Sequence, residues 1–521
     1  MEKSRRSSSL RLGDAPLDLA LVSRALSQKA GEARVTLSPK ALSLMKANAD
    51  FLVGFAKRHV VYGLNTGFGP MAKHILPEAD WVSLQYNLIR SHALGMGEAL
   101  PPLFVRAIML VRLNTLLKAH SGIYPETARV LASFLDNGVT PIIPRSGSVG
   151  ASGDLVQLAH VALAVIGEGN VMHKGIVRGA REVCAEIGCT PLQIRTREGL
   201  ALMNGTSAMT GIASVVMLGS ERALALEVHL SALLYEVSKA SSEYISAEIQ
   251  GARPHAGQGT VARQMRDLLV GSKRVRRAPV PSLGATGQEV EMQEVQHLYS
   301  IRCAPQVLGP ILDTLGYART VVEDEANSVT DNPLIVTGKG VFHGGNFHGD
   351  YVSIEMDKVK VALTKLSMLS EKHVGYLMNP RLNGALPPFL NLGVLGRDLG
   401  LQGLQFVATS STAENQTLSN PMSVHGMSTN NDNQDVVSMG ANSALLAHDV
   451  LDNAFHVLAI EAVSLVYAVR ALGIRSTLAP RIRRFHDILM KVIPVREGDG
   501  LTSSDLSRIE EHIRAMDISI T

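Results

Sequence analysis

Hydrophobic positions along the chain recur mainly at three- and four-residue spacing, which is the period of an amphipathic helix. Eight segments carry this pattern over a helix-sized length and show little strand alternation: 81–96, 103–136, 153–167, 205–248, 289–327, 350–378, 396–420 and 436–473. Short strand or turn pieces are expected at Val60–Tyr62, Asn170–Val177 and Leu334–Phe342. The pattern therefore predicts an all-α protein with minor short strands.

Two of the predicted helices, Ser207–Val237 and Asn442–Leu472, are apolar on nearly every side. Such a helix must be buried in a bundle or an oligomer. One chain cannot easily enclose several of them, so we expect a homo-oligomer of closed symmetry. Soft boundaries near 195 and 475 predict an N-terminal domain (1–195), a central long-helix bundle (196–475) and a C-terminal helical segment (476–521).

One stretch imitates a membrane span, because Gly199–Ser220 has no charged residue over about the length that crosses a bilayer. It nevertheless contains Asn204, Thr206 and four glycines, and it has no flanking aromatic belt. We therefore expect a buried central helix and no association with a membrane.

Composition excludes several classes of protein. The 521 residues include 50 basic and 47 acidic side chains, a balance that does not suit a nucleic-acid binder. Three cysteines offer neither a disulfide framework nor zinc spacing, and the N-terminus lacks the apolar region of a secretory signal. His343 and His348 share a glycine-rich turn without further ligands at metal-binding spacing. We expect a cytoplasmic protein with no metal site.

The run Gly150-Ala151-Ser152-Gly153-Asp154 contains only small residues before an apolar helix. Glycine permits the tight turn in which the amide nitrogen of Gly153 attacks the carbonyl carbon of Ala151. Ring closure with loss of water, and elimination of the Ser152 hydroxyl as a second water, would give the electrophile 4-methylideneimidazol-5-one. The alternative is a helical scaffold whose glycine-rich run cradles phosphate, although the run lacks the Lys-Ser/Thr of a P-loop.

Other motifs are individually weak. Tyr62–Gly69 has the glycine content of a mobile lid. Tyr299 and Arg302 are three residues apart, on one face of a helix, where an arginine can bind a carboxylate through two hydrogen bonds. The strings around Asn204, Asn332, Phe347 and Asn433-Gln434 have the composition of ordinary turns.

The order of these motifs resembles that of the aromatic amino acid ammonia-lyase and histidase family. Tyr-Gly-x-Asn-Thr-Gly-Phe-Gly, Ser-His, Gly-Ala-Ser-Gly-Asp-Leu, Asn-Gly-Thr, Tyr-Ser-x-Arg-Cys, Gly-Asn-Phe-His and Asn-Gln-Asp follow one another over roughly residues 35 to 475. The resemblance implies a fumarase/aspartase-like homotetramer with a long central helical bundle. It also implies active sites that are each built from three subunits.

The resemblance assigns roles by position. Ala151, Ser152 and Gly153 form the 4-methylideneimidazol-5-one, so no external cofactor is needed. The catalytic residues are Tyr62 as the base on the lid, Ser152, and Tyr299 beside the leaving amine. The substrate-binding positions are His92, Asn204, Gln296, Arg302, Asn332, Phe347, Gln402, Asn433 and Gln434, with Arg302 as the carboxylate clamp.

The expected substrate is a small aromatic amino acid. A histidase would have Gln-Glu in place of Asn433-Gln434 and methionine in place of Gln402, whereas His92 can bind a para-hydroxyl group. We expect conversion of L-tyrosine to trans-4-coumarate and ammonia, with some L-phenylalanine converted to cinnamate. Two alternatives stay open: a histidase giving urocanate, since Ser91-His92 also fits that pattern, and an aminomutase that returns ammonia to the β-carbon.

Overall fold

The computed structural model describes residues 10–27, 34–276 and 296–520. These residues form two compact units, each assembled from three segments of the chain. Unit 1 comprises 1–218, 318–357 and 421–445, and unit 2 comprises 219–317, 358–420 and 446–521. The domain boundaries predicted from the sequence are linear, whereas these units alternate along the chain, so the predicted domains stay a prediction.

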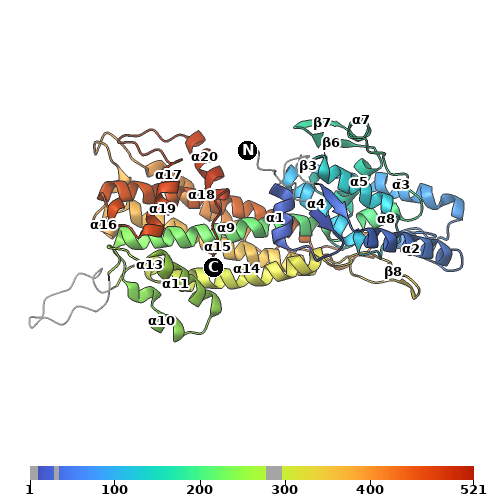
Figure 1. Cartoon of the computed structure of the whole chain (residues 1–521), viewed down its shortest axis with the longest axis horizontal. Coiled ribbons are helices and arrows are strands. Elements are labelled where there is room, and N and C mark those ends of the chain that lie inside the picture. The colour runs from blue at the N-terminus through green and yellow to red at the C-terminus, as the bar shows by residue number, and fades with distance from the viewer. Residues whose placement is uncertain (1–9, 28–33, 277–295, 521) are drawn as a thin grey trace, which may run out of the picture. The chain divides into compact units, whose positions relative to one another are not determined.

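Helices dominate both units, which confirms the predicted all-α class (Figure 1). Four long helices contribute residues to both units: α9 (Ser207–Ser238), α14 (Ala304–Ala326), α15 (Asp350–Met378) and α18 (Gly440–Leu472). By length and composition α9 and α18 qualify as membrane spans, but 72% and 78% of their most apolar windows are buried inside the protein. Burial of this extent is typical of core helices.

The remaining helices of unit 1 lie in the first part of the chain, before α9. They are α1 (Leu19–Ser27), α2 (Pro39–Ala56), α3 (Trp81–His92), α4 (Pro102–Leu117), α5 (Pro125–Asp136), α6 (Leu155–Val165), α7 (Ala180–Glu186) and α8 (Glu198–Met203). The described strands are short and also lie in unit 1. β1 (Leu10–Leu12) pairs in parallel with β2 (Val35–Leu37). The other pairings are antiparallel: β3 (Met96–Ala99) pairs with β5 (Pro144–Ser146), and β8 (Leu334–Val336) pairs with β9 (Gly340–Phe342). In the three-stranded sheet β6 (Asn170–His173) lies between β4 (Thr140–Pro141) and β7 (Ile176–Gly179).

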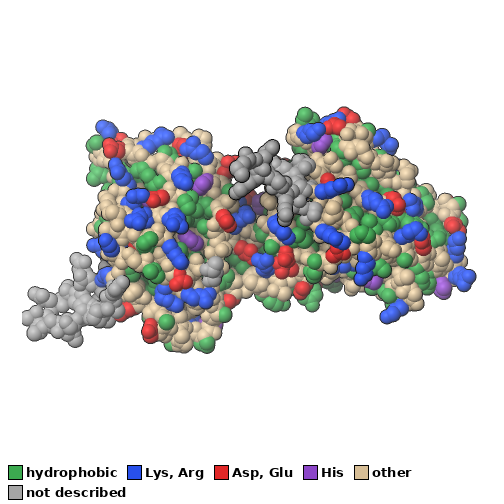
Figure 2. Space-filling view, in the orientation of Figure 1, with side chains coloured by type: hydrophobic (Ala, Val, Ile, Leu, Met, Phe, Trp, Pro, Cys, Tyr) green, Lys and Arg blue, Asp and Glu red, His purple; other side chains and the backbone are tan. Residues whose placement is uncertain are grey.

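Unit 2 adds shorter helices to its parts of the long ones. These are α10 (Ala247–Gly251), α11 (Ala256–Leu268), α13 (Tyr299–Arg302), α16 (Pro380–Asn383), α17 (Gln402–Leu418), α19 (Pro480–Leu489) and α20 (Ser503–Arg514). On the face drawn in Figure 2, basic and acidic side chains are interspersed, which matches the near balance of 50 basic and 47 acidic residues.

The local predictions for 103–136 and for Val60–Tyr62 have different outcomes. The segment 103–136 is two helices, because Ala119 (φ 60°) and Gly122 (φ 66°) take left-handed conformations that a continuous helix cannot contain. Val60–Tyr62, expected to be a short strand or a turn, contains no strand and leads into a turn, which agrees with the second alternative. Asn65 pairs the backbone there locally, since its Oδ1 accepts from the Val61 N–H at 2.7 Å and its Nδ2 donates to the His59 carbonyl at 2.8 Å.

Candidate functional site

Unit 1 contains a cavity of about 710 Å³ at the end of α3. Its walls also come from the 62–72 loop, the start of α6 and the 429–434 loop. Eight of the residues predicted from the sequence line it: Tyr62, His92, Ser152, Asn204, Asn332, Phe347, Asn433 and Gln434. The structure thus brings together side chains that are up to 372 positions apart in the sequence, from Tyr62 to Gln434.

The Ala151-Ser152-Gly153 tripeptide is folded against the backbone of Gly205. Gly153 takes a left-handed φ of 72°, and an added Cβ there would lie 2.2 Å from the Gly205 carbonyl oxygen. The next residue, Asp154, donates its N–H to that same oxygen at 2.9 Å. Only glycine fits at position 153 because both the conformation and the space exclude a side chain. The loop is therefore held in the tight turn that ring closure requires.

Two amide groups face the atoms of Ser152 that ring formation changes. Asn204 Nδ2 donates to the Ser152 carbonyl oxygen at 2.8 Å, and Gln434 Nε2 donates to Ser152 Oγ at 2.7 Å. Thr429 Oγ1 donates to Gln434 Oε1 at 2.9 Å, which fixes the orientation of that amide. A donor on the hydroxyl supports its departure, and a donor on the carbonyl stabilises negative charge there. The arrangement fits a methylidene-imidazolone formed from residues 151–153.

Asp154 anchors the loop that contains Ala151, Ser152 and Gly153 through its carboxylate. Its buried carboxylate accepts from Ser148 Oγ at 2.8 Å and from the Met209 N–H at 2.7 Å. Burial raises the pKa of Asp154 to about 6, although both hydrogen bonds oppose that change. The residue also precedes α6, so the N-terminus of that helix begins beside the tripeptide.

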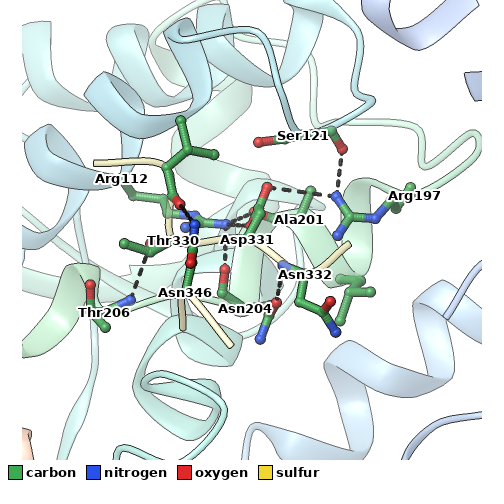
Figure 3. A network of polar contacts seen from close by, with 12 residues as sticks. Arg112, Ser121, Arg197, Ala201, Asn204, Thr206, Thr330, Asp331, Asn332 and Asn346 are labelled. Atoms are coloured by element: carbon green, nitrogen blue, oxygen red, sulfur yellow. Dashed lines mark hydrogen bonds and ion pairs between the residues drawn. The ribbon is translucent and has the colours of Figure 1, made fainter. Parts of the chain in front are cut away.

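A fully buried cluster of Arg112, Asp331 and Arg197 lies behind Asn204 (Figure 3). Arg112 Nη2 donates to Asp331 Oδ1 at 2.8 Å and to the Asn204 carbonyl at 2.9 Å, and Arg197 pairs with Asp331 Oδ2 at 3.6 Å. We call these three residues the arginine cluster. The adjacent Asn332 N–H donates to Asn204 Oδ1 at 2.7 Å, which turns the Asn204 Nδ2 toward Ser152. The arginine cluster therefore holds Asn204 and the adjoining Asn332 in place.

Tyr62 occupies a folded loop over the cavity. Its hydroxyl oxygen accepts the Gly69 N–H at 2.9 Å, and its ring meets Phe68 edge-on at 6.1 Å between centroids. Gln85 fastens the base of the loop, since its Nε2 donates to the Gly63 carbonyl at 2.9 Å. Gly63 has a φ of 67° and an added Cβ would lie 2.6 Å from the Phe68 ring, so glycine is required at this turn.

His92 ends α3 with one ring nitrogen occupied. Nδ1 lies 3.0 Å from the Leu88 carbonyl oxygen, and a carbonyl can only accept, so Nδ1 carries the proton. In the neutral ring Nε2 is then an acceptor. A hydroxyl group on a substrate ring is a suitable donor to it.

The remaining cavity walls were not predicted from the sequence. Leu84, Asn87, Leu88 and Ser91 line the cavity at helical spacing along one side of α3. The opposite loop includes Asn430–Asp432, three consecutive residues with φ between 52° and 58°. The Asn-Asn-Asp run is the signal that could have revealed this left-handed segment, since these side chains tolerate that conformation best.

Four predicted site residues do not line this cavity and belong to unit 2: Gln296, Tyr299, Arg302 and Gln402. Three of them lie together. The Arg302 guanidinium stacks 4.6 Å from the centre of the Tyr299 ring, and its Nη1 donates to Gln296 Oε1. Tyr299 is 71% exposed, while Gln402 begins α17. The predicted placement of Tyr299 and Arg302 on one helix is confirmed by α13.

The chain is similar to known proteins over most of its length. The model of the aromatic amino acid lyase family matches residues 17–491. The chain is 38% identical to the MIO-dependent tyrosine 2,3-aminomutase of Streptomyces globisporus over 495 residues, which cover 93% of this chain and 92% of that one. It is 39% identical to the tyrosine ammonia-lyase of Cupriavidus metallidurans over 481 residues, covering 90% and 89% of the two chains.

A histidine ammonia-lyase of Geobacillus thermodenitrificans is 38% identical over 472 residues, with 91% of each chain covered. The crystal structure of the Streptomyces globisporus tyrosine aminomutase matches with a TM-score of 0.92 at 36% identity, covering 98% of this chain and 99% of that one. These findings confirm the resemblance seen in the sequence motifs. The chain belongs to the aromatic amino acid lyase family, and it is a carbon–nitrogen lyase whose cofactor is 4-methylideneimidazol-5-one.

Proposed function

We propose that this enzyme eliminates ammonia from L-tyrosine to give trans-4-coumarate, with some conversion of L-phenylalanine to cinnamate. His92 carries the proposal, because it lines the same cavity as Ser152 and keeps Nε2 as an acceptor. The phenol hydroxyl of tyrosine donates to that nitrogen. A site that pairs a polar group with a substrate hydroxyl discriminates against the analogue that lacks it.

The mechanism divides the work among residues of the cavity. The cofactor supplies an electrophilic carbon beside the substrate amine, which makes that amine a better leaving group. Tyr62 Oη takes the β-proton, the electrons of the Cβ–H bond form the Cα–Cβ double bond, and the Cα–N bond breaks to release ammonia. Asn204 Nδ2, 2.8 Å from the Ser152 carbonyl oxygen, stabilises negative charge on that oxygen.

Gln296, Tyr299, Arg302 and Gln402 complete the site from neighbouring subunits of a cytoplasmic homotetramer. Support comes from the 71% exposure of Tyr299 and from the sites built from three subunits that the family resemblance implies. The Arg302 guanidinium then binds the substrate carboxylate through two hydrogen bonds, which holds the β-carbon against Tyr62.

A tyrosine 2,3-aminomutase is the second candidate, because relatives with that name are as similar as the tyrosine ammonia-lyase. In that reaction ammonia adds to the β-carbon before the product leaves. Histidine is disfavoured by Asn433-Gln434 and Gln402, on the pattern expected of a histidase.

The test is a panel of tyrosine, phenylalanine and histidine, followed by the ultraviolet absorbance of the products and by chromatography for β-tyrosine. We expect coumarate as the main product. Mainly β-tyrosine would replace the lyase with the aminomutase, and urocanate without turnover of tyrosine would replace it with the histidase. Intact mass must be two waters below the value calculated from the sequence, and an unmodified mass would contradict the whole proposal.

A further inference from the structure

Three fully buried ionisable side chains meet inside unit 2: Glu227 of α9, His373 of α15 and Glu461 of α18. His373 Nδ1 lies 2.8 Å from Glu461 Oε1 and 3.3 Å from a Glu227 oxygen. Ser370 Oγ donates to Glu461 Oε2 at 2.6 Å and Ser231 Oγ donates to Glu227 Oε1 at 2.9 Å. We call Glu227, His373 and Glu461 the histidine cluster.

The second ring nitrogen of His373 leads out of this cluster. Nε2 lies 2.9 Å from the carbonyl oxygen of Ser300, so it carries a proton. Nδ1 faces the Glu461 carboxylate at 2.8 Å and the carboxyl group of Glu227 at 3.3 Å, and it carries a proton as well, which makes the ring an imidazolium. Ser300 belongs to α13, directly between Tyr299 and Arg302. The buried charge is therefore hydrogen-bonded to the backbone of the helix that carries two proposed site residues.

A second buried histidine fixes the chain just before α13. The backbone N–H of His297 donates to Tyr244 Oη at 3.0 Å, and its ring Nε2 donates to the Ser238 carbonyl at 3.1 Å. The segment is thus anchored from inside at two points, while Tyr299 is 71% exposed. Such an arrangement holds α13 from its buried side, where Ile301 lies, and presents Tyr299 outward.

The desolvation free energy of the histidine cluster indicates that its three side chains do more than fill space. Burying three ionisable groups costs desolvation free energy that apolar side chains of similar size would avoid. Burial, and then the charge of Glu461, raises the pKa of Glu227 to about 8, so Glu227 holds a proton at neutral pH. Burial lowers the pKa of His373, but the two glutamates outweigh burial and raise it well above its ordinary value. Apart from Ser231, Ser370 and the Ser300 carbonyl, no other polar partner of the cluster is found in the described part of the chain.

We infer that His373, fixed by Glu227 and Glu461, is a positioning residue that holds α13 so that Tyr299 and Arg302 meet the substrate. The inference rests on the proposed function, in which Arg302 binds the carboxylate. A divalent metal would be the other occupant of this cluster, because its three ligand atoms all lie within 4.8 Å of one another. The 2.8 Å separation of Nδ1 and Oε1 is that of an ordinary hydrogen bond between the imidazolium and the carboxylate.

Two variants of His373 separate its contacts. An asparagine amide reaches about as far as Nδ1 and keeps a donor for Glu461, but it cannot reach the Ser300 carbonyl. A glutamine amide reaches about as far as Nε2 and can still donate to Ser300. We therefore expect His373→Asn to raise KM for tyrosine about tenfold with a smaller change in kcat, which is the loss of one hydrogen bond from a charged group. His373→Gln should recover most of that loss.

His229→Asn is the matched control. It removes a half-buried histidine of the same unit, whose Nδ1 lies 2.8 Å from the Ala225 carbonyl oxygen one helical turn earlier on α9 and whose ring packs on Phe485. KM should stay at the wild-type value. In a double-mutant cycle, His373→Asn and Arg302→Lys should be non-additive in KM, because one residue acts through the other.

Intact mass and KM distinguish the possible failures. A wild-type KM in His373→Asn, with two waters lost and tyrosine still consumed, would overturn the inference and leave the proposed function standing. Additive effects with Arg302→Lys would also overturn it. If the intact mass of the wild-type protein does not show the loss of two waters, the proposed function itself is overturned. One equivalent of metal in the purified protein, absent from Glu461→Gln, would overturn the inference by making the cluster a metal site.

Discussion

The two buried ionic clusters have opposite composition. The arginine cluster of unit 1 has two cations for one carboxylate, and a guanidinium keeps its charge at any ordinary pH. The histidine cluster of unit 2 has two glutamates for one imidazole, and the pKa values of Glu227 and His373 are both raised. Each is hydrogen-bonded to backbone that carries predicted site residues. Permanently charged side chains therefore hold the groups around Ser152, whereas titratable side chains hold α13.

The largest effect is expected where chemistry is removed and both clusters are kept. Ser152→Ala lacks the hydroxyl whose elimination creates the methylidene group, so turnover should fall at least about a thousandfold. The free energy of unfolding should change by no more than about 0.5 kcal/mol, since the side chain is small and partly exposed. Coumarate absorbance and intact mass measure the result. A variant that still loses two waters, or still turns over tyrosine, would contradict the role of Ser152.

The arginine cluster should dominate stability. Asp331→Asn leaves Arg112 and Arg197 buried without their carboxylate, and breaking a buried ion pair in this way costs about 3–5 kcal/mol. Urea denaturation of the variant measures this loss. Asp50→Asn is the control, because Asp50 pairs with Lys46 at an exposed site where such pairs contribute about 0–1 kcal/mol. Equal losses in the two variants would remove the contrast between buried and exposed pairs.

The histidine cluster should make stability depend on pH. Since burial raises the folded-state pKa of Glu227 to about 8, the folded protein holds a proton that the unfolded chain releases. The resulting stability is complete below the ordinary glutamate range and is lost as pH rises through about 8. Urea midpoints should therefore fall between pH 6.5 and 9, and less steeply in Glu227→Gln.

The arginine cluster supplies the control for this dependence. Asp331→Asn should keep the wild-type slope of unfolding free energy against pH over the same range, because its partners are guanidinium groups. Asp154 titrates lower, with a pKa of about 6, and adds little to the slope above that pH. Parallel slopes in wild type and Glu227→Gln would show that the histidine cluster is not the source.

The smallest effect concerns recognition of the substrate ring, which touches neither cluster. His92→Phe removes the acceptor for the tyrosine hydroxyl, so the ratio of kcat/KM for tyrosine to that for phenylalanine should fall about ten- to a hundredfold. His59→Phe, at an exposed position, should leave that ratio unchanged. Unaltered selectivity in His92→Phe would remove the main support for tyrosine as substrate.

Much of the helical structure and of the cavity could be predicted from local patterns in the sequence. Periodicity predicted α15 to the residue and α18 to within a few residues, and the order of motifs predicted eight residues of the cavity. Most of the failures are non-local. Arg112 pairs with Asp331 across 219 positions, and nothing in either local sequence specifies the partner. His373 and Glu461 each occupy an ordinary buried position of a helix, and only packing reveals that they meet. One failure is local: Gly122 and Pro125, just beyond Ala119, are the glycine and proline that could have predicted the break between α4 and α5.

The contact between Gly153 and Gly205 has an evolutionary consequence. Backbone lies directly on backbone there, so neither position offers a side chain through which selection could alter the fold of the tripeptide. We assign recognition of the substrate ring instead to His92, on another segment of the chain. A lineage can therefore exchange one substrate for another by point mutation while it inherits the machinery of cofactor synthesis unchanged.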